Sequence, residues 1–225
     1  QLGYFDPENI EPDMRPNFED ATVDIIFKLE ERPNDQVELS GGWGGFFGFV
    51  GTVGLVFNNF SIKNIGNFDK WRPLPVGDGQ KLSLRIQANG KSFQNYSMSL
   101  TEPWFGGKKP NALSFSFNHS VQRQLDFFNR TNPTREIGSF KITGATLGLA
   151  KRVTWPDDYF MISNSLEFQI YDFDQFGRQF GLSYETGRSN SLALNTTITR
   201  NNVDNPIYPR IGSNISLATS FTPPY

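Results

Sequence analysis

The chain has 225 residues, a formal net charge of -2 and no cysteine. The lack of cysteine excludes disulfide frameworks, thiol nucleophiles and thiolate metal sites, and the small net charge gives no electrostatic basis for binding nucleic acid. Aromatic residues make up 15% of the chain and include 22 Phe, yet the mean hydropathy is only -0.45. This composition is expected of a chain that presents an apolar side chain at every second position.

Residues 1–35 differ from the rest of the chain. They form an acidic segment. Prolines interrupt it at Pro7, Pro12, Pro16 and Pro33. Its later part, Thr22–Glu30, is rich in β-branched and apolar residues and predicts the last strand of a small soluble domain.

Between Val37 and Phe221 the sequence alternates apolar and polar residues in about nine runs, each near the length that crosses a bilayer as a tilted strand. The clearest run is Lys81–Asn89. After Asn89-Gly90-Lys91, a turn sequence of the type I′ kind, Asn95–Thr101 repeats the alternation and predicts a hairpin. The pattern continues in residues 113–118, 162–170, 192–199 and 215–221.

A soluble β-sandwich also alternates, so the periodicity alone does not exclude it. Runs of about ten residues exceed the usual soluble strand, and one face carries small polar residues where a sandwich would pack a core. Aromatic residues also gather at the run ends, which predicts interfacial girdles. One girdle would contain Trp104, Phe105, Trp155, Tyr159, Phe160 and Tyr208, and the other Tyr171, Phe173, Phe176 and Phe180. We therefore predict an antiparallel all-β transmembrane barrel.

The connections between the runs predict the orientation of this barrel. Those at 102–111, 152–158 and 201–212 are short and contain proline, whereas 121–139 and 172–190 are long and polar. Membrane barrels have short periplasmic turns and longer external loops. The first group is therefore expected in the periplasm. The connection 61–79 is long although it falls on the short-turn side, and the sequence does not explain its length.

About nine strands is an unfavourable number, because bacterial barrels normally close with an even count. The final run stops at Pro223-Pro224, two residues that cannot donate to a β-ladder. An open half-sheet would leave two unpaired edges in lipid. We therefore expect the N-terminal part of a larger barrel, with about eight or nine of its strands.

Several sequence strings are more specific than barrel alternation. Two lie in predicted periplasmic turns, TEPWFGGKKP at Thr101–Pro110 and RNNVDNPIYPRIG at Arg200–Gly212. Together with Leu2–Phe5, Val23–Glu30 and the glycine-rich Val37–Gly44, they resemble the BamA family, the central subunits of the outer-membrane β-barrel assembly machinery. The resemblance covers essentially the whole chain.

The resemblance implies a location, an activity and partners. Residues 1–35 would be the C-terminal remnant of a periplasmic POTRA domain, and residues 36–225 the N-terminal half of a barrel in the outer membrane of a Gram-negative bacterium. The protein would fold and insert β-barrel clients, with the lipid bilayer, nascent barrel proteins and accessory lipoproteins as partners. The resemblance implies no nucleotide, metal or other cofactor and no covalent chemistry.

The first predicted barrel strand is the candidate site. Its glycines provide no side-chain packing and are expected to weaken its pairing. In the family this strand forms a lateral gate that pairs with client strands through main-chain hydrogen bonds. The predicted gate residues are Val37, Leu39, Gly41, Gly42, Gly44 and Gly45. Alternatively, the glycines mark bulges or relieve crowding at a corner.

Residues in the predicted periplasmic turns are candidate contacts to accessory subunits by family analogy. They are Glu102, Lys108, Lys109, Asp204, Asn205 and Arg210. The acidic and amide members also suit ordinary turn formation next to proline. Both interpretations stay open from the sequence.

Catalysis is not predicted. An outer-membrane phospholipase would be the enzymatic rival, but His119 and Ser120 are adjacent strand residues and point to opposite faces. Asp157-Asp158 and Asp172-Phe173-Asp174 lack the further oxygen ligands of a calcium site. A passive porin or transporter barrel, and a related protein-translocating barrel, are the alternative functions.

Overall fold

The computed structural model describes residues 11–17, 22–28, 35–45, 48–71, 73–107, 110–126, 131, 135–176, 181–205 and 207–223. It divides the chain into two units, Gln1–Gln36 and Val37–Tyr225.

The first unit contains an antiparallel pair of strands, β1 (Glu11–Asn17) and β2 (Thr22–Lys28). The sequence predicts a strand only at Thr22–Glu30, and β1 lies in the part of the segment that Pro12 and Pro16 interrupt. Each strand of a two-stranded sheet has a free edge, however, and prolines are tolerated there. Whether this pair belongs to a POTRA domain stays a prediction.

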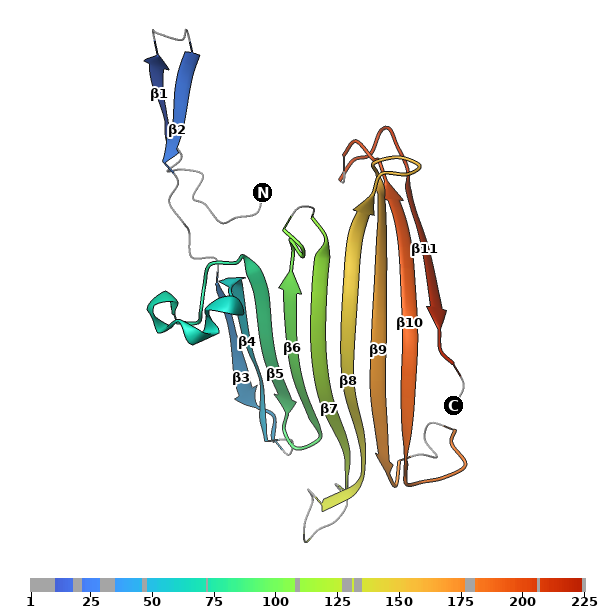
Figure 1. The fold of residues 1–225 in the computed structure, drawn as a ribbon. Helices are drawn as coiled ribbons and strands as arrows, with labels where there is room; N and C mark the ends of the chain where they lie inside the picture. The colour runs from blue at the N-terminus through green and yellow to red at the C-terminus, as the bar shows by residue number, and fades with distance from the viewer. Residues whose placement is uncertain are drawn as a thin grey trace. The chain divides into compact units, whose positions relative to one another are not determined.

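The second unit is built on one antiparallel sheet of nine strands in chain order (Figure 1). The strands are β3 (Gln36–Trp43), β4 (Phe49–Phe60), β5 (Gln80–Asn89), β6 (Phe93–Glu102), β7 (Ala112–Asp126), β8 (Arg135–Val153), β9 (Phe160–Asp174), β10 (Gly187–Asn201) and β11 (Asn214–Phe221). The antiparallel all-β prediction is confirmed. None of the described helical segments is long and apolar enough to cross a membrane.

The predicted hairpin at Gly90 is present. Asn89 pairs with Phe93, the connection is Gly90–Ser92, and the Ser92 hydroxyl donates to the Asn89 carbonyl over 2.8 Å. Gly90 has φ +57°, the left-handed conformation that glycine adopts readily.

Strands β7 to β10 are longer than predicted, with 15, 19, 15 and 15 residues. Strands therefore extend into both segments interpreted as long polar loops, over 121–126 and 135–139 in the first and over 172–174 and 187–190 in the second. Main-chain pairing continues through their polar residues, as between Gln122 and Phe140. The predicted orientation depended on short connections at one end of the sheet and long ones at the other. The structure has short and long connections at both ends, so connection length does not orient the barrel.

Alternation gives the sheet two chemically different faces. One row of paired residues crosses seven strands with only apolar side chains, and we call its side the apolar face. This row is Leu55, Leu84, Met98, Phe117, Ala145, Phe168 and Leu192. The neighbouring row, on the side that we call the polar face, is Gly54, Arg85, Ser97, Asn118, Gly144, Gln169 and Ser191.

Basic residues bracket the apolar face at both ends of two long strands. On β8, Lys141 and Lys151 share this face with the leucines between them, and on β10 Arg188 and Arg200 do the same. A strand rises about 3.3 Å per residue. At a tilt of about 40° the stretch from Lys141 to Lys151 therefore spans about 25 Å, the height of an apolar belt in a membrane barrel.

The second predicted girdle is wrong for Tyr171, Phe173 and Phe176. Tyr171 and Phe173 share the polar face with Gln169, because residues two apart along a strand point the same way. They stack with Phe140 at centroid distances of 6.3 and 4.9 Å, and Phe176 follows at 6.4 Å. Phe173 and Phe176 are only 8% and 5% exposed. Phe180 lies outside the described residues.

The long connection between β4 and β5 is a folded element. It contains two 3-10 helices, η3 (Lys63–Gly66) and η4 (Phe68–Lys70). Ser61 is fully buried, its hydroxyl donates to Asp78 Oδ2 over 2.6 Å, and it accepts from the Asn64 backbone N–H at 3.1 Å. The long connection is therefore ordered by hydrogen bonds of its own.

Candidate functional site

Strand β3 is an end strand of the nine-stranded sheet, and among the described residues it pairs only with β4. All eight of its residues are exposed, with Val37 at 75% and Leu39 at 78%. The other main-chain edge of such a strand offers unpaired N–H and C=O groups to a further strand.

Two of the predicted gate residues lie outside this strand. β3 ends at Trp43, and Gly44 and Gly45 form the connection to β4. The Gly44 N–H donates to the Gly48 carbonyl over 2.8 Å, and Gly45 has φ +61°. A tight reversal needs this left-handed backbone, so glycine serves the turn here rather than softening the strand.

On the apolar face a phenylalanine ring covers two glycines. A Cβ at Gly41 would lie 3.0 Å from Phe49 Cζ, and a Cβ at Gly51 would lie 2.8 Å from the same atom. A Cβ at Gly51 would also lie 2.6 Å from the Ser40 carbonyl oxygen. The ring of Phe49 thus joins β3 to β4 in the space that the missing side chains leave.

On the polar face an ion pair crosses β4. The Arg85 guanidinium on β5 donates to the Glu38 carboxylate on β3. Gly54 lies between them, and a Cβ there would be 3.2 Å from Glu38 Oε2. The ion pair is about half exposed and contributes little by itself, but it connects the end strand to the second strand beyond it.

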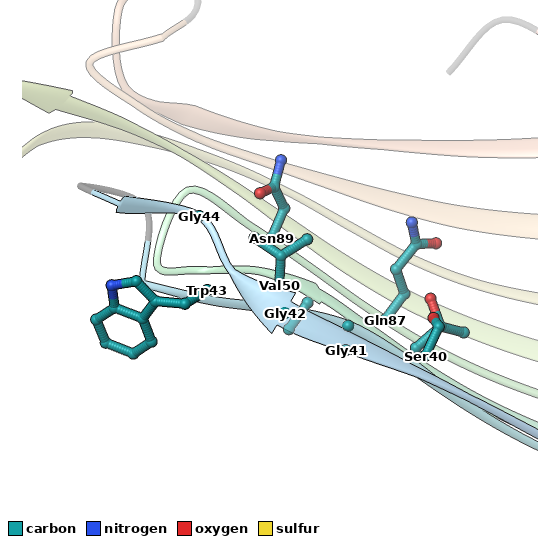
Figure 2. Close-up of a pocket in the computed structure, with 11 residues that line it drawn as sticks. Ser40, Gly41, Gly42, Trp43, Gly44, Val50, Gln87 and Asn89 are labelled. Atoms are coloured by element: carbon teal, nitrogen blue, oxygen red, sulfur yellow. The ribbon is translucent and has the colours of Figure 1, made fainter.

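Beside these contacts the sheet is hollowed. The hollow measures about 500 Å³ and lies along β3, β4 and β5 near the end of β3. Figure 2 shows Val50, Gln87 and Asn89 on one side of the sheet, whereas Trp43 points away from them. The glycines of β3 form part of its wall.

Glu102 shapes two connections at one end of the sheet. Its Oε2 accepts from Gln80 Nε2 over 2.7 Å, and its Oε1 accepts from the Trp104 backbone N–H over 3.2 Å. The Gln80 side chain in turn accepts from the Ile62 N–H at 2.9 Å. Glu102 therefore ties the β4–β5 connection to the β6–β7 connection.

Asp204 organises the connection between β10 and β11. Its Oδ1 accepts from the backbone N–H groups of Asn205, Arg210 and Ile211 at 2.9, 2.9 and 3.1 Å. The hydrogen bonds from Arg210 and Ile211 are the main reason that the pKa of Asp204 is lowered from 3.8. The Asn205 side-chain oxygen also accepts a hydrogen bond, from the Ile207 backbone N–H at 2.9 Å.

Arg200 is a residue that the sequence does not single out. Its Nε donates to Asp157 Oδ2 over 2.8 Å, and its Nη1 donates to Asn202 Oδ1 and Ser213 Oγ at 3.0 and 3.1 Å. The guanidinium also lies 5.8 Å from the centroid of the Tyr159 ring. The sequence signal that could have identified Arg200 is a basic residue at a strand end, close to predicted girdle aromatics.

Three of the predicted contact residues form no part of these hydrogen-bonded arrangements through their side chains in the described structure. Arg210 is exposed, and Lys108 and Lys109 lie outside the described residues. The contact roles of these residues, and the gate role of the β3 residues, stay predictions. His119 is held by Thr143, whose hydroxyl lies 2.8 Å from its Nδ1.

The aspartates considered as calcium ligands have other partners. Asp172 pairs with Arg188 at 3.5 Å, and Asp157 pairs with Arg200 at 2.8 Å. Both pairs lie at strand ends.

Comparison with known proteins agrees with this architecture. The Omp85 superfamily domain matches residues 76–225. Among solved structures, the fold is similar to BamA from Haemophilus ducreyi lacking POTRA domains 1-3, with a TM-score of 0.58 and 20% sequence identity. The match covers 99% of this chain and 40% of that one, so the chain spans less than half of its structural relative. No curated protein sequence matches the chain.

The predicted resemblance is thus confirmed by the superfamily match and by the shared fold. The superfamily is not a classical enzyme family. The family match covers most of the nine-stranded sheet, from the start of β5 to β11. The chain therefore belongs to the Omp85 superfamily of outer-membrane proteins.

Proposed function

We propose that residues 37–225 form part of a barrel wall in the bacterial outer membrane, with the apolar face toward lipid. The support is the apolar band between Lys141 and Lys151 on β8, since lysine extends from a lipid-facing strand toward headgroups. The ion pairs of Arg188 and Arg200 bound the same face on β10. The polar face would line the interior. The exposed Trp104, Trp155 and Tyr208 would lie at the interface at one rim.

Within this barrel, the proposed activity is the folding and insertion of other β-barrel proteins, with β3 as the strand that receives them. The observation that carries this proposal is the exposed β3 edge in an Omp85 fold. A client strand joining that edge would gain main-chain hydrogen bonds without a dedicated side-chain site. Val37, Leu39, Gly41 and Gly42 belong to this pairing strand, and Gly44 and Gly45 to the turn that follows it.

The same proposal assigns partners to the remaining parts. The unit with β1 and β2 would be the end of a periplasmic POTRA domain. Glu102, Asp204 and Asn205 would hold the shape of connections that face accessory lipoproteins, whereas Lys108, Lys109 and Arg210 would contact them. None of these steps uses a nucleotide, a metal or another cofactor.

The test is disulfide cross-linking in the full-length protein. Cysteine placed by Leu39→Cys or Gly41→Cys should trap nascent barrel clients that carry a cysteine in a terminal strand. Cysteine placed by Ser165→Cys, in the middle of the sheet, should trap none. Absence of any client adduct at both β3 positions would remove the insertase proposal.

A passive pore is the alternative, and the continuous polar face is the observation that favours it. Depletion of an insertase should lower the amounts of other barrel proteins in the outer membrane. A passive pore should instead conduct ions steadily in a planar bilayer, and its depletion should leave other barrels at normal amounts. The two measurements together separate these functions.

A further inference from the structure

We propose that the hollow beside Gly42 is a socket for one side chain of the strand that pairs with β3. The side chain it takes is long and ends in a hydrogen-bonding group, as in Tyr or Gln. This inference rests on the proposed function, because it requires a second strand at the β3 edge. It adds a preference for a particular side chain to main-chain pairing.

The first observation is that three strand glycines in this corner lie under the side chains of Phe49 or Glu38. Phe49 covers Gly41 and Gly51, and Glu38 covers Gly54. Gly42 differs from these three, since a Cβ there would meet nothing within 4 Å. Gly42 is thus the uncovered glycine within β3 itself, and a second strand pairing with β3 would approach from its free edge.

The second observation is the direction of the open space. Glu38 is on the polar face, because it pairs with Arg85 across Gly54. Alternation along β3 places Ser40 and Gly42 on that same face. In an incoming strand, the residue opposite or diagonal to Gly42 would also point to the polar face, within about 4.5 to 8 Å. A long side chain at that position reaches the hollow over the bare backbone of Gly42.

The third observation is the chemistry of the walls. Hydroxyl groups of Ser40 and Thr52 and amide groups of Gln87 and Asn89 line the hollow of about 500 Å³. Among the described residues, none of these four side chains has a hydrogen-bond partner. Together they offer both donors and acceptors. A phenol or a carboxamide can satisfy them, whereas a purely apolar ring would displace water without replacing its hydrogen bonds.

The experiment uses the full-length protein with the Leu39→Cys substitution and no other cysteine. Leu39 lies on the apolar face, so the cysteine leaves the hollow unchanged. The probes are ten-residue peptides of alternating Val and Thr, with one cysteine on the Val face. A guest residue, Tyr, Gln, Phe or Ala, replaces each Thr in turn. The disulfide yield with each peptide is measured under a fixed redox buffer.

At one guest position, Tyr and Gln should raise the yield about 2- to 10-fold over Ala, the ratio given by one net hydrogen bond. Phe should stay below Tyr. Gly42→Val should abolish this preference while the Ala peptide still reacts, because the valine fills the socket. Gly66→Val, at an equally open position in η3, should preserve it. Gln87→Ala combined with Asn89→Ala should remove the advantage of Tyr over Phe without filling the space.

Failure of the socket and failure of the proposed function are distinguishable. Equal yields for all guests at every position would overturn the socket and leave strand pairing at β3 intact. No adduct with any peptide would overturn the pairing proposal and the socket with it. Retention of the Tyr preference in both Gly42→Val and the double amide variant would also overturn the socket.

Discussion

At the scale of the residue, Asp204 holds the β10–β11 connection through a single carboxylate oxygen. Hydrogen bonds from Arg210 and Ile211 lower its pKa in the folded state. A carboxylate with a lowered folded-state pKa stabilises the fold above its unfolded pKa, and this contribution is lost as the pH falls through the folded-state value. The order of the connection should therefore depend on pH on the acidic side of 3.8.

We predict that the amide resonances of Arg210 and Ile211 shift together in an NMR titration below this pH. Asp204→Asn should abolish the titration, because the amide keeps one acceptor but carries no charge. Asp158→Asn, an exposed position in another connection, should leave it in place. A titration that persists in Asp204→Asn would refute the assignment.

A second residue-scale prediction concerns the two faces of the sheet. Leu84→Arg or Phe117→Arg should destabilise the membrane-inserted full-length barrel by about 2 to 4 kcal/mol, because a charge would enter the hydrocarbon region. Ser83→Arg and Ser116→Arg, on the polar face of the same strands, should cost little. Denaturant titration of the barrel folded into lipid vesicles measures the difference. Equal losses on both faces would contradict the lipid-facing assignment.

Contacts at this scale are the least accessible to sequence analysis. The cover of Gly51 by Phe49 depends on where β3 lies against β4, and neither residue type signals it. Gly44 and Gly45 were predicted in the strand because the glycine run has no internal boundary. The turn begins where the backbone reverses, which the positive φ of Gly45 shows.

At the scale of the element, β3 is held to the sheet on both faces, by Phe49 on one and Glu38 on the other. We predict that Gly51→Ala releases β3, because the new methyl group would lie 2.6 Å from the Ser40 carbonyl oxygen. Amide exchange of Leu39 and its strand neighbours should accelerate at least about 5-fold, as expected for a loss of about 1 kcal/mol in a β-ladder.

The control for this prediction is Gly42→Ala on the neighbouring strand. A Cβ at Gly42 meets nothing within 4 Å, so exchange should be unchanged or slower. If Gly51→Ala left the exchange of β3 unchanged, the close approach of the two backbones would be wrong.

Strands were predictable where one face is apolar, as in Lys81–Asn89, because a period of two is then visible in the composition. Their extent was not. The outer parts of β7 and β8 carry polar residues on both faces, so the alternation disappears while main-chain pairing continues. Hydrogen bonding between backbones does not depend on side-chain polarity, and the strands are therefore longer than the alternating runs of the sequence.

At the scale of the whole second unit, the basic residues on β8 predict the position of the bilayer. Nitroxide labels at 141, 147 and 151 in the reconstituted full-length protein should report the greatest oxygen accessibility at 147. Both ends should be more accessible to a polar nickel reagent, because they would lie at the two interfaces. A label at 146, on the polar face, is the matched control and should show low oxygen accessibility. A flat profile from 141 to 151 would contradict the proposed belt.

The stacked rings of Phe140, Tyr171, Phe173 and Phe176 have a mechanical consequence for the far end of the long strands. Aromatic side chains rotate about only two torsions, and Phe140 on β8 stacks with Tyr171 and Phe173 on β9 and with Phe176 just beyond it. The ends of β8 and β9 beyond the belt should therefore move together as one stiff unit.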